Sequence, residues 1–406
     1  MTLKFGTDGI RGKAGVEPLT KTTIEMLGSA IALSCGENPT VVIGMDTRES
    51  STWICDALCE GIQTAGGNVI VGGIMPTAAV SCATIGEKAS RGVMITASHN
   101  PFYDNGIKVF SESGRKLTTK QQEDLLHAFG QTPTQQQRGT RTNHSHLAQH
   151  WIQRLPKPAL SNMTILLDCA HGAASVHVPN ILSDLGAKLV LRGCHPNGTN
   201  INDNVGALHP PKDLQGCDLA ICFDGDADRL MLVDAKGNIL DGDDILWLLR
   251  NHFEGPLVGT VLSNGGLEDA LHGRLLRSPV GDANVEKYMH TSGAYLGAEP
   301  SGHILFRDGL ATGDGAYTVL RLLQCLGEVP KRPSWERWPV CKENLTITKR
   351  IDLSILKSIK KAEESGQRVI VRYSGTEPLL RIMVEGKEAQ FHLQQIREEF
   401  LEYSSS

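Results

Sequence analysis

Short hydrophobic runs rich in β-branched residues alternate with amphipathic stretches through most of the chain. In the first third, such runs lie at residues 41–43, 69–71 and 93–95, and a stretch of helical periodicity separates the first two. This alternation predicts βαβ units built on a largely parallel, buried sheet. The polar stretch at residues 131–150 and the prolines that follow it place the end of this first domain near residue 158.

The same alternation starts again twice. A second set of runs extends from residues 165–167 to 219–223, and a third begins at residues 258–262. After a segment rich in proline and tryptophan, the last part of the chain combines helical patterns with a hairpin-like pair of strands. The sequence therefore predicts three similar α/β domains with mixed, largely parallel sheets and a small C-terminal α+β domain. We expect these domains at residues 1–158, 159–253, 254–335 and 336–406.

Composition narrows the range of partners. The 406 residues are 40% hydrophobic and 21% charged, as in folded globular proteins. The net charge of -5 and the lack of a basic block argue against nucleic acid as the main partner, although they allow a local anion site. Because no long apolar stretch occurs, we expect neither a signal peptide nor a membrane span, and a cytoplasmic location. These features do not fix the oligomeric state, and a homodimer is one option.

Three aspartates give the densest chemical signal. Asp224, Asp226 and Asp228 lie at alternate positions between two hydrophobic runs. Carboxylates so spaced can converge on one hard cation, and an oxygen-only ligand set favours Mg²⁺ over Zn²⁺. A calcium EF-hand loop would need glycine at its sixth position and glutamate at its twelfth, where this chain has Arg229 and Ala235. The sequence therefore predicts a magnesium site.

Ser98 is the candidate nucleophile. It follows the hydrophobic run at residues 93–95, and a serine at the carboxyl end of a strand lies where open α/β sheets bind their ligands. Such a serine could be acylated or phosphorylated. The flanking glycines of a hydrolase nucleophile elbow are absent. Because His99 is adjacent to Ser98 in sequence, we expect it to shape the turn rather than to face the serine as a base.

Another polar loop contains Glu299, Ser301 and His303 between two short hydrophobic runs. Carboxylate, hydroxyl and imidazole groups suit the hydroxyl groups of a sugar. An ordinary turn between two strands explains the same residues equally well. The loop is therefore a candidate sugar site whose interpretation depends on its neighbours.

The last loop combines hydroxyls, a glycine and arginines, namely Arg372, Ser374, Gly375, Thr376 and Arg381. Guanidinium groups match the geometry of phosphate oxygens, so these residues form a candidate phosphate cradle. No G-x-x-x-x-G-K-[ST] sequence occurs in the chain, and ATP hydrolysis through a P-loop is therefore not supported.

Together these loops resemble, in order and spacing, the α-D-phosphohexomutase superfamily over nearly the whole chain. The resemblance is carried by Phe5-Gly-Thr-Asp-Gly-Ile-Arg-Gly12, by Ser98-His-Asn-Pro-Phe-Tyr-Asp-Asn-Gly-Ile-Lys108, by the Gly-Ala-Glu before Ser301, and by Thr312-Gly-Asp-Gly. The wording of these loops is similar to the bacterial members that act on glucosamine phosphates. The resemblance implies four domains around a central cleft. It also implies an isomerase that interconverts glucosamine 6-phosphate and glucosamine 1-phosphate through a bisphosphate intermediate, in amino-sugar nucleotide and cell-wall precursor synthesis.

The resemblance further implies roles for individual residues. Ser98 would be the phosphoserine and would bind Mg²⁺ together with Asp224, Asp226 and Asp228. The cations expected beside the transferring phosphoryl group are Lys108, Arg11 and Arg229. The residues expected to bind the sugar and its other phosphate are Glu299, Ser301, His303, Arg372, Ser374, Gly375, Thr376 and Arg381.

Three positions depart from the family pattern. Ala227 stands where the metal loop usually has glycine, which restricts the backbone if the residue there needs a positive φ. Pro300 stands where asparagine or glutamine is common. Ala283 follows Asp282 where arginine is usual, so a cation of the third domain is absent. Two alternatives remain: a phosphomannomutase or phosphoglucomutase of the same superfamily, and a sugar-phosphate-binding protein without turnover.

Overall fold

The structure is a computed structural model that describes residues 9–133, 137–374 and 378–405. The chain forms two compact units. The first comprises Met1–Leu262 and Leu276–Pro333, and the second comprises Ser263–Leu275 and Ser334–Ser406. Each unit is described by itself below.

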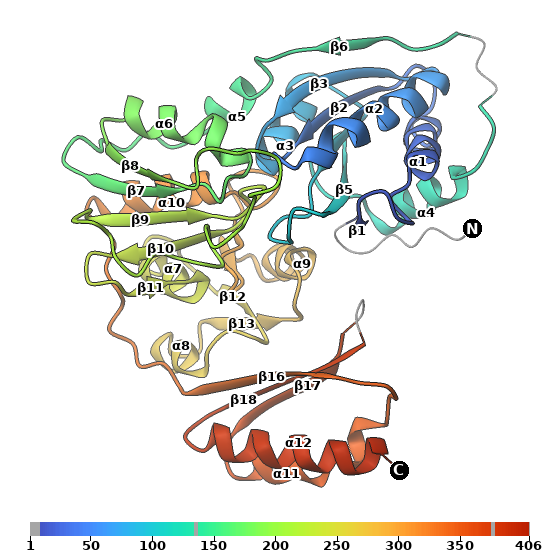
Figure 1. The fold of residues 1–406 in the computed structure, drawn as a ribbon. Helices are drawn as coiled ribbons and strands as arrows, with labels where there is room; N and C mark the ends of the chain where they lie inside the picture. The colour runs from blue at the N-terminus through green and yellow to red at the C-terminus, as the bar shows by residue number, and fades with distance from the viewer. Residues whose placement is uncertain (1–8, 134–136, 375–377, 406) are drawn as a thin grey trace. The chain divides into compact units, whose positions relative to one another are not determined.

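The first sheet has six strands in the order β1-β5-β4-β2-β3-β6 (Figure 1). The strands β2, β3, β4 and β6 run parallel, whereas β5 is antiparallel to β4 and β1 is antiparallel to β5. The strands are β1 (Ile10–Lys13), β2 (Thr40–Met45), β3 (Asn68–Ile74), β4 (Arg91–Ile95), β5 (Asp104–Ser111) and β6 (Arg141–Asn143). The helices are α1 (Lys21–Leu33), α2 (Glu49–Thr64), α3 (Thr77–Gly86), α4 (Thr119–Ala128) and α5 (Gln149–Ile152).

Both faces of this sheet are covered by helices, because alternate strand residues point to opposite faces. On one face, Ile43, Val93 and Ile107 join one hydrophobic core with residues of α1 and α2. On the other face lies α3, which approaches the sheet so closely at Gly44 that a Cβ atom there would lie 2.4 Å from a methyl group of Val80. The continuous hydrophobic runs in the sequence therefore reflect strands that are buried on both sides.

Two further sheets in the chain repeat this plan. The second has the order β11-β10-β9-β7-β8 and the third β13-β12-β14-β15. In the first sheet β4 pairs with a parallel neighbour and an antiparallel one, and β9 and β14 do the same in theirs. The strands are β7 (Thr164–Asp168), β8 (Lys188–Arg192), β9 (Leu219–Phe223), β10 (Leu230–Asp234), β11 (Ile239–Leu240), β12 (Leu257–Thr260), β13 (Leu275–Ser278), β14 (Leu296–Ala298) and β15 (Ile304–Phe306).

The helices that accompany these sheets are η1 (Ala173–Val176), α6 (Val178–Asp184), α7 (Gly242–Leu249), α9 (Asp282–Ser292) and α10 (Gly315–Leu326). The helix α8 (Gly265–Ala270) belongs to the second unit. A single topological position recurs in the three sheets: the loop that leaves the last parallel strand and enters its antiparallel partner. The loops after β4, β9 and β14 carry Ser98, Asp224 and Glu299, respectively. The candidate residues thus occupy equivalent places in three sheets.

The second unit contains an antiparallel sheet with the order β16-β18-β17. Its elements are β16 (Val340–Thr346), η2 (Leu353–Ile355), α11 (Lys357–Glu364), β17 (Arg368–Tyr373), β18 (Leu379–Glu385) and α12 (Ala389–Ser405). In Figure 1, α11 and α12 lie together on one face of this sheet. Its core joins Ile382 and Val384 on β18 to Ile396 and Phe400 on α12. This is the small α+β domain that the sequence predicts.

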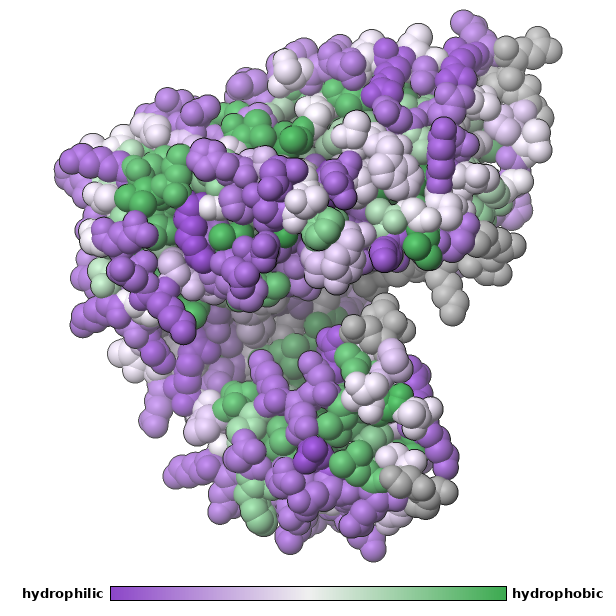
Figure 2. All heavy atoms as spheres, in the orientation of Figure 1, coloured by the Kyte–Doolittle hydropathy of each residue, from purple (hydrophilic) through white to green (hydrophobic). Residues whose placement is uncertain are grey.

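The visible surface is mixed in polarity. On the face shown in Figure 2, hydrophobic residues occur in small groups among hydrophilic ones. Within the described residues, no helix is both long enough and apolar enough to cross a membrane.

Candidate active site

The loop between β9 and β10 brings three buried carboxylates together. Asp224, Asp226 and Asp228 each offer an oxygen, and these oxygens lie within 4.8 Å of one another. The chain turns sharply between the last two, because Ala227 has a left-handed φ of 60°. The predicted convergence of the three carboxylates therefore depends on Ala227, which has a backbone conformation that favours glycine.

The donor set fits a hard divalent cation. All three groups are carboxylates, and two of their buried oxygens, Asp226 Oδ1 and Asp228 Oδ1, have no hydrogen-bond partner among the described residues. A buried oxygen without a partner is costly unless a cation or water satisfies it. Oxygen-only sites of this kind suit Mg²⁺ or Ca²⁺ better than Zn²⁺. The three carboxylates could therefore hold a metal ion. The choice of Mg²⁺ is a proposal.

Two side chains of the first domain hold the carboxylates from the other side. Lys108 on β5 places its Nζ 2.6 Å from Asp226 Oδ2 and 2.8 Å from Asp228 Oδ2. Thr77, at the start of α3, donates its hydroxyl to Asp226 Oδ2 at 2.5 Å. Its backbone N–H also donates to the carbonyl of Asp226 at 3.1 Å. Lys108 lies where the resemblance expects a cation, whereas Thr77 was not identified from the sequence.

Ser98 lies directly against this loop. It follows β4, is buried, and has a left-handed φ of 54°. Its hydroxyl donates to Asp224 Oδ2 at 2.5 Å, and its backbone N–H donates to the hydroxyl of Thr96 at 2.8 Å. A serine with positive φ is strained and is often found at a functional site. The structure therefore brings together the candidate nucleophile and the carboxylates that the sequence singled out.

The electrostatics of the three aspartates are unequal. Burial raises the pKa of Asp224 to about 7, and repulsion from Asp228 and Asp226 adds to this rise. Burial acts in the same direction on Asp228, but the ammonium of Lys108 and the imidazole of His303 outweigh it and hold its pKa well below the usual range. Since like charges within 4.8 Å of one another cannot all ionise cheaply, this cluster needs cations beyond Lys108.

His99 lies close to Ser98. The sequence predicts that it shapes the turn rather than facing the serine as a base, and its Nδ1 lies 3.4 Å from Ser98 Oγ, at the long end of hydrogen bonding. Adjacent residues can meet here because the left-handed conformation of Ser98 folds the chain back. Burial, together with the positive charges of Arg229 and Arg11, lowers the pKa of His99 to about 4, so the imidazole is neutral at pH 7.

The two expected arginines lie on different elements. Arg229 follows the aspartate loop, which we define as residues 224–228. Its Nε is 4.0 Å from Asp224 Oδ2 and 3.9 Å from Asp228 Oδ1. Arg11 lies on β1, opposite Gly106 of β5, and its buried Nε has no hydrogen-bond partner among the described residues. Both guanidinium groups thus lie near the site, and neither forms a short ion pair within the described part of the chain.

The loop between β14 and β15 reaches the same region. His303 Nδ1 lies 3.9 Å from Asp228 Oδ1, and its Nε2 lies 3.5 Å from Asp282 Oδ2. Burial disfavours a charged imidazole, but these carboxylates and Glu299 outweigh it and raise the pKa of His303. Gly302 has a φ of 88°, and a Cβ atom there would lie 2.1 Å from the carbonyl oxygen of Leu230. This glycine lets the loop approach the strand that follows the aspartate loop.

The remaining residues of this loop are less closely tied. Glu299 accepts a hydrogen bond from the N–H of Gly281 at 2.9 Å, and Ser301 is half-buried. The arginine missing after Asp282 has a counterpart in space: Lys116 Nζ lies 2.6 Å from Asp282 Oδ1. A cation does reach the third domain, but it comes from the first domain, which the local sequence around Asp282 could not reveal.

The phosphate-type loop belongs to the second unit. Arg372 on β17 lies directly opposite Arg381 on β18, so the two side chains share one face of the hairpin. Like charges in this arrangement are unfavourable, and an anion between them would offset the repulsion. The buried Ser374 follows β17, and Arg350 donates to its carbonyl at 3.1 Å. Gly375 and Thr376 lie outside the described residues.

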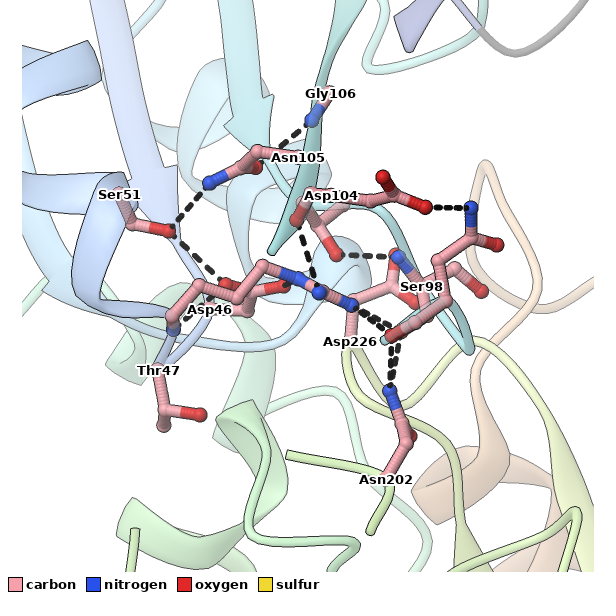
Figure 3. Close-up of polar contacts among 12 residues, drawn as sticks. Asp46, Thr47, Ser51, Ser98, Asp104, Asn105, Gly106, Asn202 and Asp226 are labelled. Carbon is pink, nitrogen blue, oxygen red and sulfur yellow. Dashed lines mark hydrogen bonds and ion pairs between the residues drawn. The ribbon is translucent and has the colours of Figure 1, made fainter. Parts of the chain in front are cut away.

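Arg48 is a further buried residue that sequence reasoning missed. It follows β2, the parallel neighbour of β4, and its guanidinium bonds several carbonyls of the Ser98 loop. Figure 3 shows the neighbouring Asp46, Ser98 and Asn202. The feature of the sequence that could have identified Arg48 is its position after a buried strand. The Asp-Thr-Arg sequence after β2 lies at the same carboxyl edge of the sheet as Ser98, where ligands and catalytic groups gather in open α/β folds.

Comparison with known protein families accounts for almost the whole chain. Models described as phosphoglucomutase/phosphomannomutase alpha/beta/alpha domains I, II and III match residues 2–136, 145–237 and 241–337. The C-terminal domain model of the same family matches residues 343–403. The predicted fold class, three α/β domains followed by a smaller one, is confirmed. The predicted boundaries and the central cleft stay predictions.

Individual relatives agree with this. A phosphoglucosamine mutase from Thiobacillus denitrificans is 39% identical over 427 residues, which cover 95% of this chain and 93% of that protein. A phosphoglucomutase/phosphomannomutase family protein from Burkholderia thailandensis has a TM-score of 0.75 at 22% identity, covering 98% of this chain and 96% of that one. N-acetylphosphoglucosamine mutase from Aspergillus fumigatus, solved with GlcNAc-6P and magnesium, has a TM-score of 0.65 at 16% identity, covering 100% and 96%. These two solved structures show a shared fold.

Proposed function

The chain belongs to the phosphoglucomutase/phosphomannomutase family, and from that premise we propose that it interconverts glucosamine 6-phosphate and glucosamine 1-phosphate through a phosphorylated Ser98. The observation that carries this proposal is the short contact between Ser98 Oγ and Asp224, beside two further carboxylates and Lys108. The choice of an amino sugar is supported by the relatives that act on glucosamine phosphate, such as the one from Thiobacillus denitrificans.

The proposed reaction has two transfers. In the first, the O–P bond of phosphoserine 98 breaks, a new O–P bond forms to the free hydroxyl of the sugar monophosphate, and the proton of that hydroxyl ends, in net balance, on Ser98 Oγ. The product is a hexosamine bisphosphate. After the sugar turns over, its other phosphate returns to Ser98, and the second monophosphate is released. The phosphoenzyme is thereby regenerated, and no other phosphate donor is consumed.

Charge balance explains the surrounding residues. A phosphoserine carries about -1.5 to -2 at neutral pH, and it would lie beside three aspartates. Phosphoryl transfer depends mainly on neutralising this charge and on aligning the reacting oxygens. Lys108 is close enough to act on two of the carboxylates, and Arg229 and Arg11 are the further cations that we assign to the transferring group.

We assign Mg²⁺ to this site, held by Asp224, Asp226, Asp228 and an oxygen of the phosphate on Ser98. Two buried carboxylate oxygens that have no hydrogen-bond partner in the described part of the chain, and an oxygen-only donor set, support this choice. When bound, the ion would neutralise charge on the transferring phosphoryl group. The magnesium in the Aspergillus fumigatus structure supports the same assignment by family likeness.

Two loops are assigned to the rest of the substrate. We propose that Glu299, Ser301 and His303 bind the sugar hydroxyls. The phosphate that is not transferred would be bound by Arg372, Ser374, Gly375, Thr376 and Arg381. Because the sugar must react at both ends, this second group has to accept the phosphate in two sugar orientations. A cytoplasmic location and a homodimer remain part of the proposal as predictions from the sequence.

The first test is Ser98→Ala. We expect the mutase rate to fall by about 10³-fold or more, because the covalent carrier is lost. Intact-mass measurement after incubation with a hexose 1,6-bisphosphate should show one added phosphoryl group in the wild type and none in this variant. The control is Ser113→Ala, an exposed serine in the turn after β5, which should behave as wild type. Full turnover in Ser98→Ala would refute the proposal.

The same assay decides the sugar. Glucosamine 6-phosphate, glucose 6-phosphate and mannose 6-phosphate should be compared at equal concentration by kcat/KM. We expect the amino sugar to give the highest value. A higher value for glucose or mannose phosphate would keep the phosphoserine chemistry and replace the substrate.

A further inference from the structure

We propose that Arg48 and Asn202 are positioning residues that fix the main chain of the Ser98 loop and thereby aim the serine hydroxyl at the aspartate loop. The inference rests on the proposed role of Ser98 as the phosphoryl carrier. Neither Arg48 nor Asn202 is proposed to contact the substrate. Arg48 comes from the first α/β domain and Asn202 from the second, so the nucleophile is held from two domains at once.

Arg48 lies behind the Ser98 loop with 2% of its surface exposed. Its Nη2 donates to the carbonyls of Ser98 at 3.0 Å and Asn100 at 2.8 Å. Its Nη1 donates to the carbonyl of Asp104 at 3.0 Å and also contacts that of Pro101. One rigid guanidinium therefore bonds four carbonyls along the turn between β4 and β5. A guanidinium is planar with fixed donor directions, so it imposes one geometry on the turn.

Arg48 is itself held in place. Its Nε donates to Asp46 Oδ2 at 2.9 Å, and its backbone N–H donates to Asp46 Oδ1 at 3.1 Å. Ser51 donates to the same Asp46 Oδ1 at 3.0 Å. The charge of the guanidinium is thus paired with a buried carboxylate, and its remaining donors are directed at the turn. Because Asp46 fixes the Arg48 side chain, Arg48 can in turn fix the position of the Ser98 turn.

Asn202 approaches the same turn from the loop that follows β8. Its Nδ2 donates to the carbonyl of Ser98 at 2.9 Å and to that of Asn100 at 3.1 Å. These are two of the carbonyls that Arg48 bonds, so each receives a second donor. The two domains also meet directly here, because the N–H of Glu49 donates to the carbonyl of Gly198 at 2.9 Å. Asn202 therefore links the nucleophile loop to the domain that carries the three aspartates.

The loop that carries the three aspartates also packs against the Ser98 carbonyl. A Cβ atom on Gly225 would lie 2.5 Å from it, so the backbone of the aspartate loop packs against this oxygen. The carbonyl is held by Arg48 on one side and by Asn202 on another. Its position consequently sets the separation between the two loops. Phosphoryl transfer needs the reacting oxygens in line, and a displacement of about 1 Å can cost on the order of 10²-fold in rate.

The strained conformation of Ser98 explains why external donors are needed. A serine with a φ of 54° is less stable locally than one in an extended strand. The turn persists only if surrounding groups over-determine it. Removing one donor should let the turn relax toward an ordinary conformation, which would move the hydroxyl away from Asp224 without unfolding the domain.

The test uses the full-length enzyme with Mg²⁺ and compares Asn202→Ala with Asn204→Ala. Both residues lie in the same loop and have left-handed φ values, 61° and 54°. The side chain of Asn204 donates to Asp203 and not to the Ser98 turn. We expect Asn202→Ala to lower kcat by about tenfold to a hundredfold, with KM and the melting temperature close to those of Asn204→Ala. A merely structural role would instead lower the melting temperature and leave kcat of the folded enzyme unchanged.

Two further measurements make the result decisive. The rate of phosphoryl transfer from a hexose 1,6-bisphosphate to Ser98, followed by rapid quench and intact mass, should fall in Asn202→Ala and in Arg48→Lys. Lysine keeps the charge but cannot bond four carbonyls at once. Wild-type kcat and wild-type labelling in both variants would overturn the inference. A wild-type enzyme that never labels Ser98 would overturn the proposed function, and this inference with it, so the two failures are distinguishable.

Discussion

The Ser98 loop and the aspartate loop leave equivalent strands of two similar sheets. β4 and β9 are buried along all five residues, and each continues through its loop into an antiparallel partner. Each loop also contains a non-glycine residue in a left-handed conformation, Ser98 in one and Ala227 in the other. In the first loop the strained residue is the candidate nucleophile, whereas in the second it lies between two carboxylates.

The two loops are held by different means. The Ser98 loop is fixed through its main chain, because Arg48 and Asn202 bond its carbonyls. The aspartate loop is held at its main-chain carbonyls by backbone N–H groups, and its carboxylates are in addition bonded by Lys108 and Thr77. The comparison suggests a division of labour in which one loop supplies geometry and the other supplies charge. Substitutions around the Ser98 loop should therefore change kcat, and those around the aspartate loop should change metal binding and stability.

The largest effect that would sharpen this comparison is expected from Lys108→Met. Removing one partner of a buried ion pair costs about 3–5 kcal/mol, because Asp226 and Asp228 lose their closest cation. The free energy of unfolding should fall most in a chelator, and Mg²⁺ should restore part of it by replacing the missing charge. Urea unfolding with and without Mg²⁺ measures this. An equal loss in both conditions would show that the cluster does not share its charge with a metal.

A somewhat smaller effect is expected from Asp226→Asn, which keeps the shape and removes one charge. We expect kcat to fall by about 10²–10³-fold, as for other losses of preorganised charge, and more Mg²⁺ to be needed for half-maximal rate. The sugar KM should change little. Asp213→Asn, at an exposed position of the same domain, is the matched control. Unchanged metal dependence in Asp226→Asn would place the metal elsewhere.

The sequence was sufficient to single out the groups that we propose to react, but not those that we propose to position them. Strand periodicity placed Ser98 and Asp224 at the carboxyl ends of buried strands, and three alternating carboxylates are a strong local signal. The positioning donors carry no such signal, since Arg48 lies 50 residues and Asn202 lies 104 residues from Ser98. Only the folded sheets bring them together, and a single sequence gives no register between domains.

Two contacts that the sequence did not reveal have the same origin. The approach of His99 to Ser98 occurs where Ser98 has a positive φ. The cation that pairs with Asp282 is Lys116, 166 residues earlier in the chain. Local sequence motifs predict local chemistry, whereas contacts between domains depend on packing that cannot be read from the pattern of a single sequence.

A third prediction separates the two loops through Thr77→Val. The loss of a buried hydrogen bond to an ionised group costs about 1.5–3 kcal/mol, and it should loosen Asp226. We expect weaker Mg²⁺ activation with an unchanged sugar KM. Thr84→Val is the control, because Thr84 lies in the same helix and its hydroxyl bonds only the carbonyl of Val80 among the described residues. If Thr77→Val lowered kcat with unchanged Mg²⁺ dependence, the distinction between the loops would fail.

The smallest effect concerns the strained residue of the aspartate loop, and Ala227→Gly tests it. Three contributions oppose one another. Relief of a left-handed alanine stabilises the fold by about 1–2 kcal/mol, whereas the extra freedom of unfolded glycine costs about 0.4–1 kcal/mol. Loss of a buried methyl group costs about 0.8 kcal/mol. These nearly cancel, so we expect the free energy of unfolding to change by no more than about 0.5 kcal/mol, with Mg²⁺ activation and kcat near wild type.

Ala170→Gly is the matched control for this last prediction, because Ala170 is also buried and has a φ of 53° in the same domain. Similar small changes in both variants would show that Ala227 tolerates its conformation as any buried alanine does, and that its difference from the family glycine is neutral for the site. A large loss of kcat in Ala227→Gly alone would show that the methyl group helps to shape the aspartate loop. In that case geometry would matter in both loops, and the division between a loop that supplies position and a loop that supplies charge would have to be abandoned.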